Sequence, residues 1–148
     1  MIELPEQEPC EFCEGMAGRD PTWAVIEECT HTMTAINPSQ YEVGQCCVIT
    51  KRHVGTLLEL TDEEAPSIIK AAQRAAIALV NLYRPLGILT FQNNGVYSGQ
   101  EVPHYHFHVV PRQPEGGACK STHRCCTRPQ TLFGKTCRTS LSNVCATD

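Results

Sequence analysis

The sequence has no apolar run long enough to cross a bilayer, and it carries little positive charge. Its formal net charge is -4, so it lacks the excess of basic residues that nonspecific duplex binding needs. We therefore expect neither a membrane nor a nucleic acid as a partner. The first residues, MIELPEQEP, are acidic and lack the basic-then-apolar order of a signal peptide, which predicts a cytoplasmic protein. No internal repeat is present, and a length of 148 residues suits one hydrophobic core.

Cysteine, in contrast, is abundant, with ten residues in the chain. Because the sequence carries no sign of secretion, metal binding or free thiols are favoured over a disulfide framework. A nucleotide ligand remains compatible with the acidic composition, since backbone amides and imidazoles bind small phosphates without a basic patch.

The composition changes near residue 113. Residues 1–113 contain seven Lys/Arg and fourteen Asp/Glu, whereas residues 114–148 contain five and two, together with five of the ten cysteines. The second segment has few aliphatic or aromatic residues and no helical or strand period. We predict a folded domain over 1–113 and a disordered Cys/Ser/Thr-rich tail over 114–148. The tail could alternatively be an interaction arm, or a metal-binding appendage that uses Cys119, His123, Cys125 and Cys126.

The sequence of residues 1–113 predicts one long helix and five strands. Alternating or β-branched runs predict strands over 23–28, 32–36, 46–50, 88–93 and 104–111. Thr61 and Glu64 fit a capping box, and Pro85 and Gly87 end the helix that follows. Its apolar face is expected to contain Ile68, Ile69, Ala72, Ala75, Ala76, Leu79, Val80 and Tyr83. This order predicts an α+β domain on an antiparallel sheet, with an irregular C-terminal tail.

Three of the six histidines fall within five residues, in the run His104-Tyr105-His106-Phe107-His108. In a strand the three imidazoles would share one face about 6.6 Å apart, with the apolar residues between them facing the core. Such a row can bind an anion, transfer a proton or attack phosphorus, and it can also bind a metal. Three buried core histidines are a poor alternative because each imidazole would need a partner. A three-histidine metal centre is the stronger alternative.

Residues rich in glycine and amides precede this strand. Ser98-Gly99-Gln100 and Asn93-Asn94-Gly95 could let backbone amides approach a phosphate, although such residues also form ordinary turns. Their position before a histidine strand favours a phosphate pocket.

The segment GQEVPHYHFHVVPR, residues 99–112, resembles the signature of the histidine-triad (HIT) family, His-x-His-x-His followed by two apolar residues. ITKRH, residues 49–53, is similar to the Val-Ile-Pro-Lys-x-His stretch of that family. The resemblance extends over about residues 10 to 112 and implies the HIT-like fold. It also implies a nucleotide hydrolase or nucleotidyl transferase that acts on the α-phosphate of nucleoside phosphoramidates or dinucleoside polyphosphates.

The resemblance also implies roles for single residues. His106 would be the nucleophile that forms a nucleotidyl-histidine intermediate, and neutral imidazole is nucleophilic near pH 7. The residues implied to bind the purine nucleotide are Asn37 at the ribose and Asn93, Gly99, Gln100 and His108 at the phosphate. Two positions depart from the family pattern. Gln45 stands where a histidine is common, and could still hydrogen-bond the triad without titrating. Glu101 replaces a frequent Ser/Thr near the leaving group, where an anionic carboxylate would repel phosphate.

Cys10-Glu11-Phe12-Cys13 has the spacing of two zinc ligands. By itself this CxxC motif could also be a redox pair, two bare thiols or a disulfide. Bacterial-type HIT proteins look similar here, which implies a structural Zn²⁺ held by Cys10, Cys13, His53 and His104. The family resemblance also implies a homodimer. Two other functions stay open: a metallohydrolase with zinc on the triad itself, and a nucleotide-binding or partner-binding protein without catalysis.

Overall fold

The computed structural model describes residues 2–114. All but the first residue of the predicted tail, 114–148, lies outside the described residues, so the predicted domain boundary stays a prediction. Within the described part, no helix has the length and apolar character needed to span a bilayer.

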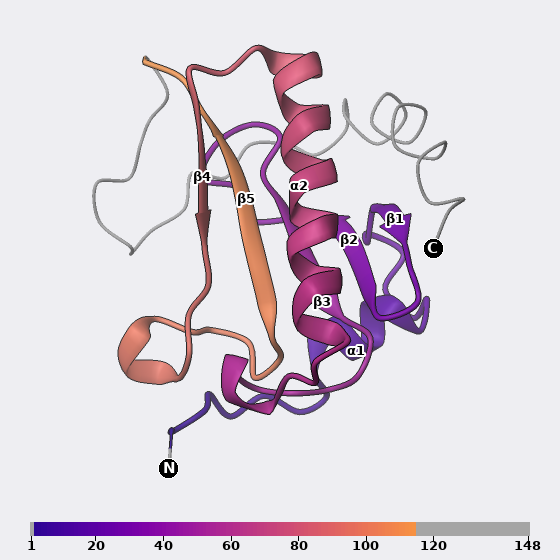
Figure 1. The fold of residues 1–148 in the computed structure, drawn as a ribbon. Helices are drawn as coiled ribbons and strands as arrows, with labels where there is room; N and C mark the ends of the chain where they lie inside the picture. The colour runs from indigo at the N-terminus through magenta and orange to yellow at the C-terminus, as the bar shows by residue number, and fades with distance from the viewer. Residues whose placement is uncertain (1, 115–148) are drawn as a thin grey trace.

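A five-stranded antiparallel sheet forms the centre of the domain (Figure 1). Its spatial order is β1-β2-β3-β5-β4, which places β1 and β4 at the two edges. The strands are β1 Val25–Glu28, β2 Thr32–Ile36, β3 Cys46–Thr50, β4 Gly87–Phe91 and β5 His106–Arg112. The expected order of three strands, one helix and two strands is confirmed, and so is the α+β antiparallel class.

The bounds of three strands differ from expectation. β1 begins two residues later than predicted, and β4 runs from Gly87 to Phe91 rather than over 88–93. β5 begins at His106, so the expected strand start at His104 is wrong. The N-terminal helix α1, Glu11–Met16, was not expected from the sequence, and neither were the short 3-10 helices η1, Leu57–Glu59, and η2, Val96–Ser98.

The long helix α2, Glu64–Tyr83, begins with the expected capping box. The Glu64 backbone N–H donates to the Thr61 hydroxyl at 3.3 Å, and the Glu64 carboxylate accepts from the Thr61 N–H at 3.0 Å. Two bonds therefore satisfy amides that the first helical turn would otherwise leave without partners.

The face of α2 that packs on the sheet differs in part from the expected one. Ile68, Ala72, Ala75 and Leu79 are buried as predicted. Ile69 and Val80, by contrast, are 59% and 45% exposed, which corrects their assignment to the core. An apolar stripe in the sequence predicts burial only where another element covers it, and within the described residues nothing covers this side of α2.

The two faces of the sheet have different covers (Figure 1). α2 lies over one face, where its buried residues pack with Val48, Tyr105 and Val109. On the other face, Phe12 of α1 packs with Cys47 and Ile49. The partners of Cys47 and Ile49 across the β3–β5 ladder are His108 and His106, so both of these histidines face the α1 side.

Candidate active site and metal centre

His106 lies at the start of β5, against α1. Its Nδ1 donates a hydrogen bond to the backbone carbonyl of His104 at 2.7 Å. Because a carbonyl oxygen only accepts, this bond places the proton of the neutral ring on Nδ1 and leaves a lone pair on Nε2. The Phe12 ring packs edge-to-face on His106, with centroids 4.9 Å apart. Burial lowers the pKa of His106, so the ring is neutral at neutral pH.

His108 is the neighbour of His106 on the same face, with ring centroids 4.8 Å apart. Its Nδ1 lies 3.1 Å from Nε2 of Gln45 and 3.1 Å from the Cys47 thiol. Phe91 of β4 stacks on the ring, with centroids 4.3 Å apart and planes inclined by 18°. Burial, together with the neighbouring His106, lowers the pKa of His108 to about 3.

His104 does not join this row, which corrects the expectation that three imidazoles alternate along one strand. It precedes β5, and its ring lies between Cys10, Cys13 and His53. Burial lowers its pKa to about 4, against the effect of its bond to the Thr50 carbonyl. The triad is therefore divided: two rings belong to one pocket, and the third faces a separate cluster.

The loop before β5 places three predicted phosphate-binding residues together. The side-chain amide of Asn93 donates to the Gly99 carbonyl at 3.1 Å. The backbone N–H groups of Gly99 and Gln100 donate to the carbonyls of Val96 and Gly95. The buried Gln100 side chain accepts from the Gly95 N–H and donates to the carbonyls of Gly55 and Val102. These bonds give the loop a defined shape, and the phosphate-binding roles stay a prediction.

Asn37 directly follows β2, and its side-chain oxygen accepts a hydrogen bond from the Ser39 N–H at 2.9 Å. Burial raises the pKa of the Cys47 thiol and the Asn37 side chain opposes this rise, so Asn37 lies near the thiol that contacts His108. The predicted ribose-binding role is compatible with this position and stays a prediction.

The four predicted zinc ligands do come together. One potential ligand atom from each of Cys10, Cys13, His53 and His104 lies within 4.8 Å of every other. The Cys13 sulfur lies 3.2 Å from Nδ1 of His53 and 3.5 Å from Nδ1 of His104, and the Cys10 sulfur lies 3.5 Å from the same His104 atom. Zinc bonds of about 2.3 Å to sulfur and about 2.0 Å to nitrogen separate two such ligands by about 3.5 Å at a tetrahedral angle. The donor set and its spacing fit zinc.

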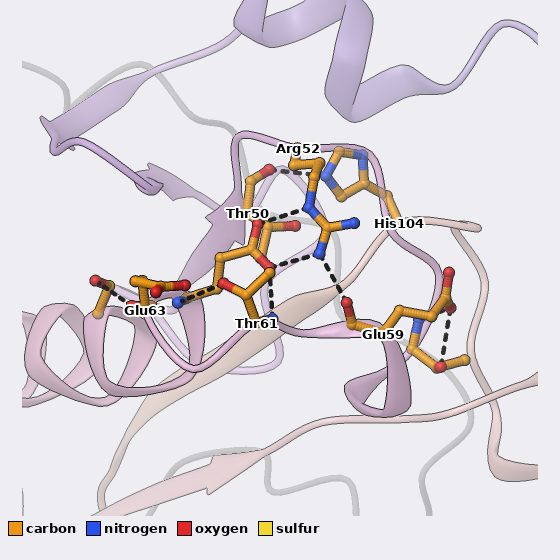
Figure 2. Close-up of polar contacts among 9 residues, drawn as sticks. Thr50, Arg52, Glu59, Thr61, Glu63 and His104 are labelled. Atoms are coloured by element: carbon orange, nitrogen blue, oxygen red, sulfur yellow. Dashed lines mark hydrogen bonds and ion pairs between the residues drawn. The ribbon is translucent and has the colours of Figure 1, made fainter.

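The hydrogen bonding of His104 also fits a ligand role. Nε2 of His104 donates to the Thr50 carbonyl at 2.8 Å (Figure 2). This bond leaves the lone pair on Nδ1, the atom that lies 3.5 Å from both sulfurs. Metal-binding histidines commonly have such a carbonyl partner on the second ring nitrogen.

An ion pair fixes the segment that carries His53. The guanidinium of Arg52 binds the Glu64 carboxylate at 2.9 and 2.7 Å and the Glu59 carbonyl at 2.7 Å (Figure 2). This network ties the residue next to His53 to η1 and to the start of α2.

The cysteines of the described residues are free thiols: Cys10, Cys13, Cys29, Cys46 and Cys47. The alternative of a Cys10–Cys13 disulfide is therefore not supported. Burial and the adjacent Cys10 raise the pKa of Cys13 to about 11, so a second anionic sulfur is unfavourable here without a cation.

Sequence reasoning missed three side chains that shape the site, namely Phe12, Cys47 and Phe91. Phe12 lies inside the CxxC motif and contacts both His104 and His106. Cys47 and Phe91 are the cross-strand neighbours of His108 in β3 and β4. The β-branched-rich run of β3 predicted a buried strand, but the strand order that brings Cys47 and Phe91 beside His108 could not be read from the sequence.

Known proteins resemble this chain in sequence and in fold. The HIT domain model matches residues 24–115. "Protein hit" of Bacillus subtilis is 37% identical over 128 residues, which cover 84% of this chain and 88% of that protein. Adenosine 5'-monophosphoramidase HNT1 of Saccharomyces cerevisiae is 32% identical over 108 residues, 72% of this chain and 64% of that one. A Zn-bound histidine triad family protein from Mycobacterium smegmatis superimposes with a TM-score of 0.77 at 24% identity, covering 91% of this chain and 94% of that chain.

An antiparallel sheet with one long helix, and a strand whose buried histidines face away from that helix, define a histidine-triad protein. The match over residues 24–115 covers more than half of the chain. The chain belongs to the HIT family.

Proposed function

We propose that this protein is a nucleotide hydrolase or nucleotidyl transferase whose nucleophile is Nε2 of His106. The observation that carries the proposal is the 2.7 Å bond from Nδ1 of His106 to the His104 carbonyl. That bond fixes the one tautomer in which Nε2 has a free electron pair, and burial keeps the ring neutral. The relative that is an adenosine 5'-monophosphoramidase supports a purine nucleoside phosphoramidate as the substrate class.

The proposed reaction has two displacement steps. Nε2 of His106 attacks the α-phosphorus, and the bond to the leaving group breaks as the new P–N bond forms. The leaving amine takes up a proton, or a nucleotide leaves as its phosphate anion. Water then attacks the same phosphorus, the P–N bond to His106 breaks, and the mononucleotide is released. In this scheme His108, Asn93, Gly99 and Gln100 surround the phosphate and Asn37 binds the ribose.

A substrate panel tests the proposal. Purified protein is incubated with adenosine phosphoramidate, diadenosine polyphosphates and nucleotide sugars, and the products are separated. We expect AMP release from at least the phosphoramidate. A short quench followed by peptide mass spectrometry should find a nucleotidyl group on His106. Turnover without any nucleotidyl peptide, and unchanged in His106→Ala, would reject the covalent mechanism.

Two features favour a second candidate, a nucleotide-binding protein without catalysis. Gln45 cannot titrate as the family's usual histidine does, and Glu101 places an exposed carboxylate near the pocket. AMP binding measured by calorimetry, together with no turnover of any panel member, would favour this candidate.

The cluster of Cys10, Cys13, His53 and His104 is proposed to hold a structural Zn²⁺. The fit rests on the donor set, the separations of 3.2 to 3.5 Å and the lone pair on Nδ1 of His104. The relative whose structure is described as Zn-bound agrees with this choice of metal. Within residues 2–114, neither His106 nor His108 belongs to a cluster of potential metal ligands. This favours a nucleophilic role for His106 over zinc binding by the triad.

A homodimer is proposed from the surface of α2 and β4. Ile69, Ile77 and Val80 are exposed on α2, and Leu86, between α2 and β4, is 79% exposed. β4 is an edge strand, and among residues 2–114 no strand pairs with its outer side. A second copy of the chain would cover both features at once, since a twofold axis brings the same surface of each copy together.

A further inference from the structure

Gln45 is a fully buried amide immediately before β3, with 0% of its surface exposed. Its Oε1 accepts a hydrogen bond from the backbone N–H of Tyr41 at 2.7 Å. A backbone N–H can only donate, so the atom that faces Tyr41 must be the oxygen. The orientation of the amide is thereby determined, and its NH₂ group is the end that faces the pocket.

That NH₂ group lies 3.1 Å from Nδ1 of His108. An amide nitrogen only donates, so Nδ1 of His108 must be the acceptor and cannot carry a proton. In a neutral ring the proton then resides on Nε2. The Cys47 thiol, also 3.1 Å from Nδ1, does not alter this result, because a thiol both donates and accepts.

We propose that Gln45 is a positioning residue that holds His108 as the Nε2–H tautomer, so that His108 donates a hydrogen bond to a phosphate oxygen of the substrate. The inference rests on the proposed function for the identity of the acceptor. Phe91 fixes the plane of the ring by stacking, and Gln45 fixes which nitrogen carries the proton.

The two rings of the pocket are therefore held in opposite tautomers. The His104 carbonyl accepts from His106 and so keeps its proton on Nδ1, whereas the Gln45 amide donates to Nδ1 of His108 and so leaves the proton of His108 on Nε2. One ring presents a lone pair and its neighbour presents a proton, which is the pairing that attack on an anionic phosphate requires. An amide has no second tautomer, so Gln45 imposes this assignment whether or not substrate is bound.

The tautomer is measured directly by two-dimensional ¹⁵N–¹H NMR of the histidine side chains at a fixed neutral pH, without substrate. In the wild-type protein we expect His108 to show an unprotonated Nδ1 and a protonated Nε2. Gln45→Leu removes the donor, and should give a mixture of tautomers. Gln45→Glu places an acceptor opposite Nδ1, and should move the proton to Nδ1. A wild-type His108 with a protonated Nδ1 would overturn the proposal, whatever the variants do.

Gln40→Leu is the matched control. Gln40 lies in the same loop and its Oε1 accepts from the Gly44 N–H at 2.8 Å, four residues away, as Gln45 does for Tyr41. Both Leu variants lose one such loop bond, but only the Gln45 variant also loses the amide that lies 3.1 Å from Nδ1 of His108. Loss of the His108 tautomer in Gln40→Leu as well would reduce the effect to loop stability and reject the positioning role.

Kinetics and AMP binding give the second readout. Gln45→Leu should lower kcat/KM on adenosine phosphoramidate about tenfold, the worth of one hydrogen bond. Gln45→His restores an N–H donor and should recover most of the loss. Unchanged kcat/KM in Gln45→Leu would overturn the proposal. If the wild-type chain turns over no substrate, the proposed function fails, while the NMR result and the affinity for AMP still decide the role of Gln45.

Discussion

Nδ1 of His106 lies 2.7 Å from the backbone carbonyl oxygen of His104, the residue whose own ring faces the two thiols of the CxxC motif. One residue thus contributes its backbone to the proposed nucleophile and its side chain to the proposed metal site. The metal cluster and the catalytic pocket use different histidine rings but share one short segment of chain, and Phe12 contacts both His104 and His106. Loosening the cluster should therefore weaken the orientation of His106 without removing it.

His106→Ala should abolish nucleotide hydrolysis and leave the fold intact. The change removes the only proposed phosphorus-attacking group, and the side-chain contacts that it deletes are those with the rings of Phe12 and His108 and with the His104 carbonyl. Activity is measured on adenosine phosphoramidate, and the fold is checked by circular dichroism and melting temperature. His31→Ala, at the turn between β1 and β2, is the control and should retain wild-type activity. An unaltered rate in His106→Ala would remove the nucleophile assignment.

The double variant Cys10→Ser, Cys13→Ser should lose the zinc that we expect at one ion per chain. Serine offers no thiolate, so two of the four ligands disappear. The metal content of protein purified without chelator is measured by mass spectrometry. Activity should fall less than metal content, because zinc takes no part in the proposed displacement. Cys29→Ser is the control, since Cys29 lies outside the cluster. Zinc absent from the wild-type protein would refute the site, and zinc retained by the variant would place it elsewhere.

Ile77→Lys should shift the protein from dimer to monomer. Ile77 is 56% exposed on α2, and burying a lysine ammonium in an apolar contact is unfavourable. Molar mass is measured by light scattering after size exclusion, over a range of protein concentrations. Glu6→Lys, in the exposed N-terminal segment, is the control for added charge and should stay dimeric. A wild-type mass equal to one chain at every concentration would reject the dimer.

Stability should fall as the pH is lowered below about 6.5, and His108 should contribute to the fall. The folded-state pKa of His108, about 3, is lower than its ordinary value of 6.5, so the unfolded chain takes up a proton first. The contribution of His108 is present in full above pH 6.5 and is lost as the pH falls toward 3. The slope of a single such group approaches about 1.4 kcal/mol per pH unit.

Urea unfolding of the wild type and of His108→Asn, measured at matched pH values, checks this prediction. Other acid-sensitive groups are common to both chains, so their effects cancel in the difference between the slopes. The Asn variant should show the shallower loss of unfolding free energy between about pH 6 and about pH 4. This range lies between the pKa of His108 in the unfolded chain and its pKa in the folded protein. Equal slopes would show that His108 takes up its proton at the same pH in the folded and the unfolded protein, and would contradict the lowered pKa.

The sequence by itself determined the features that depend on neighbouring residues. The capping box at Thr61 and Glu64, the order of strands and helix along the chain and the same-face placement of His106 and His108 all follow from local spacing. The grouping of Cys10 and Cys13 with His53 and His104 was also predicted, but from family resemblance rather than from spacing, since the Cys10–His104 contact joins residues 94 positions apart.

Only the tertiary structure decided which surfaces are covered and which tautomers the rings adopt. Ile69 and Val80 belong to an apolar pattern that looks buried, yet they are exposed because no described element packs there. The turn before His106 removed His104 from the row of alternating side chains, since the strand begins two residues later than its pattern suggests. Gln45 looked like a departure from the family, and its meaning came from one backbone N–H that fixed its amide against His108. Hydrogen-bond direction depends on the partners that folding brings together, and no local sequence pattern records those partners.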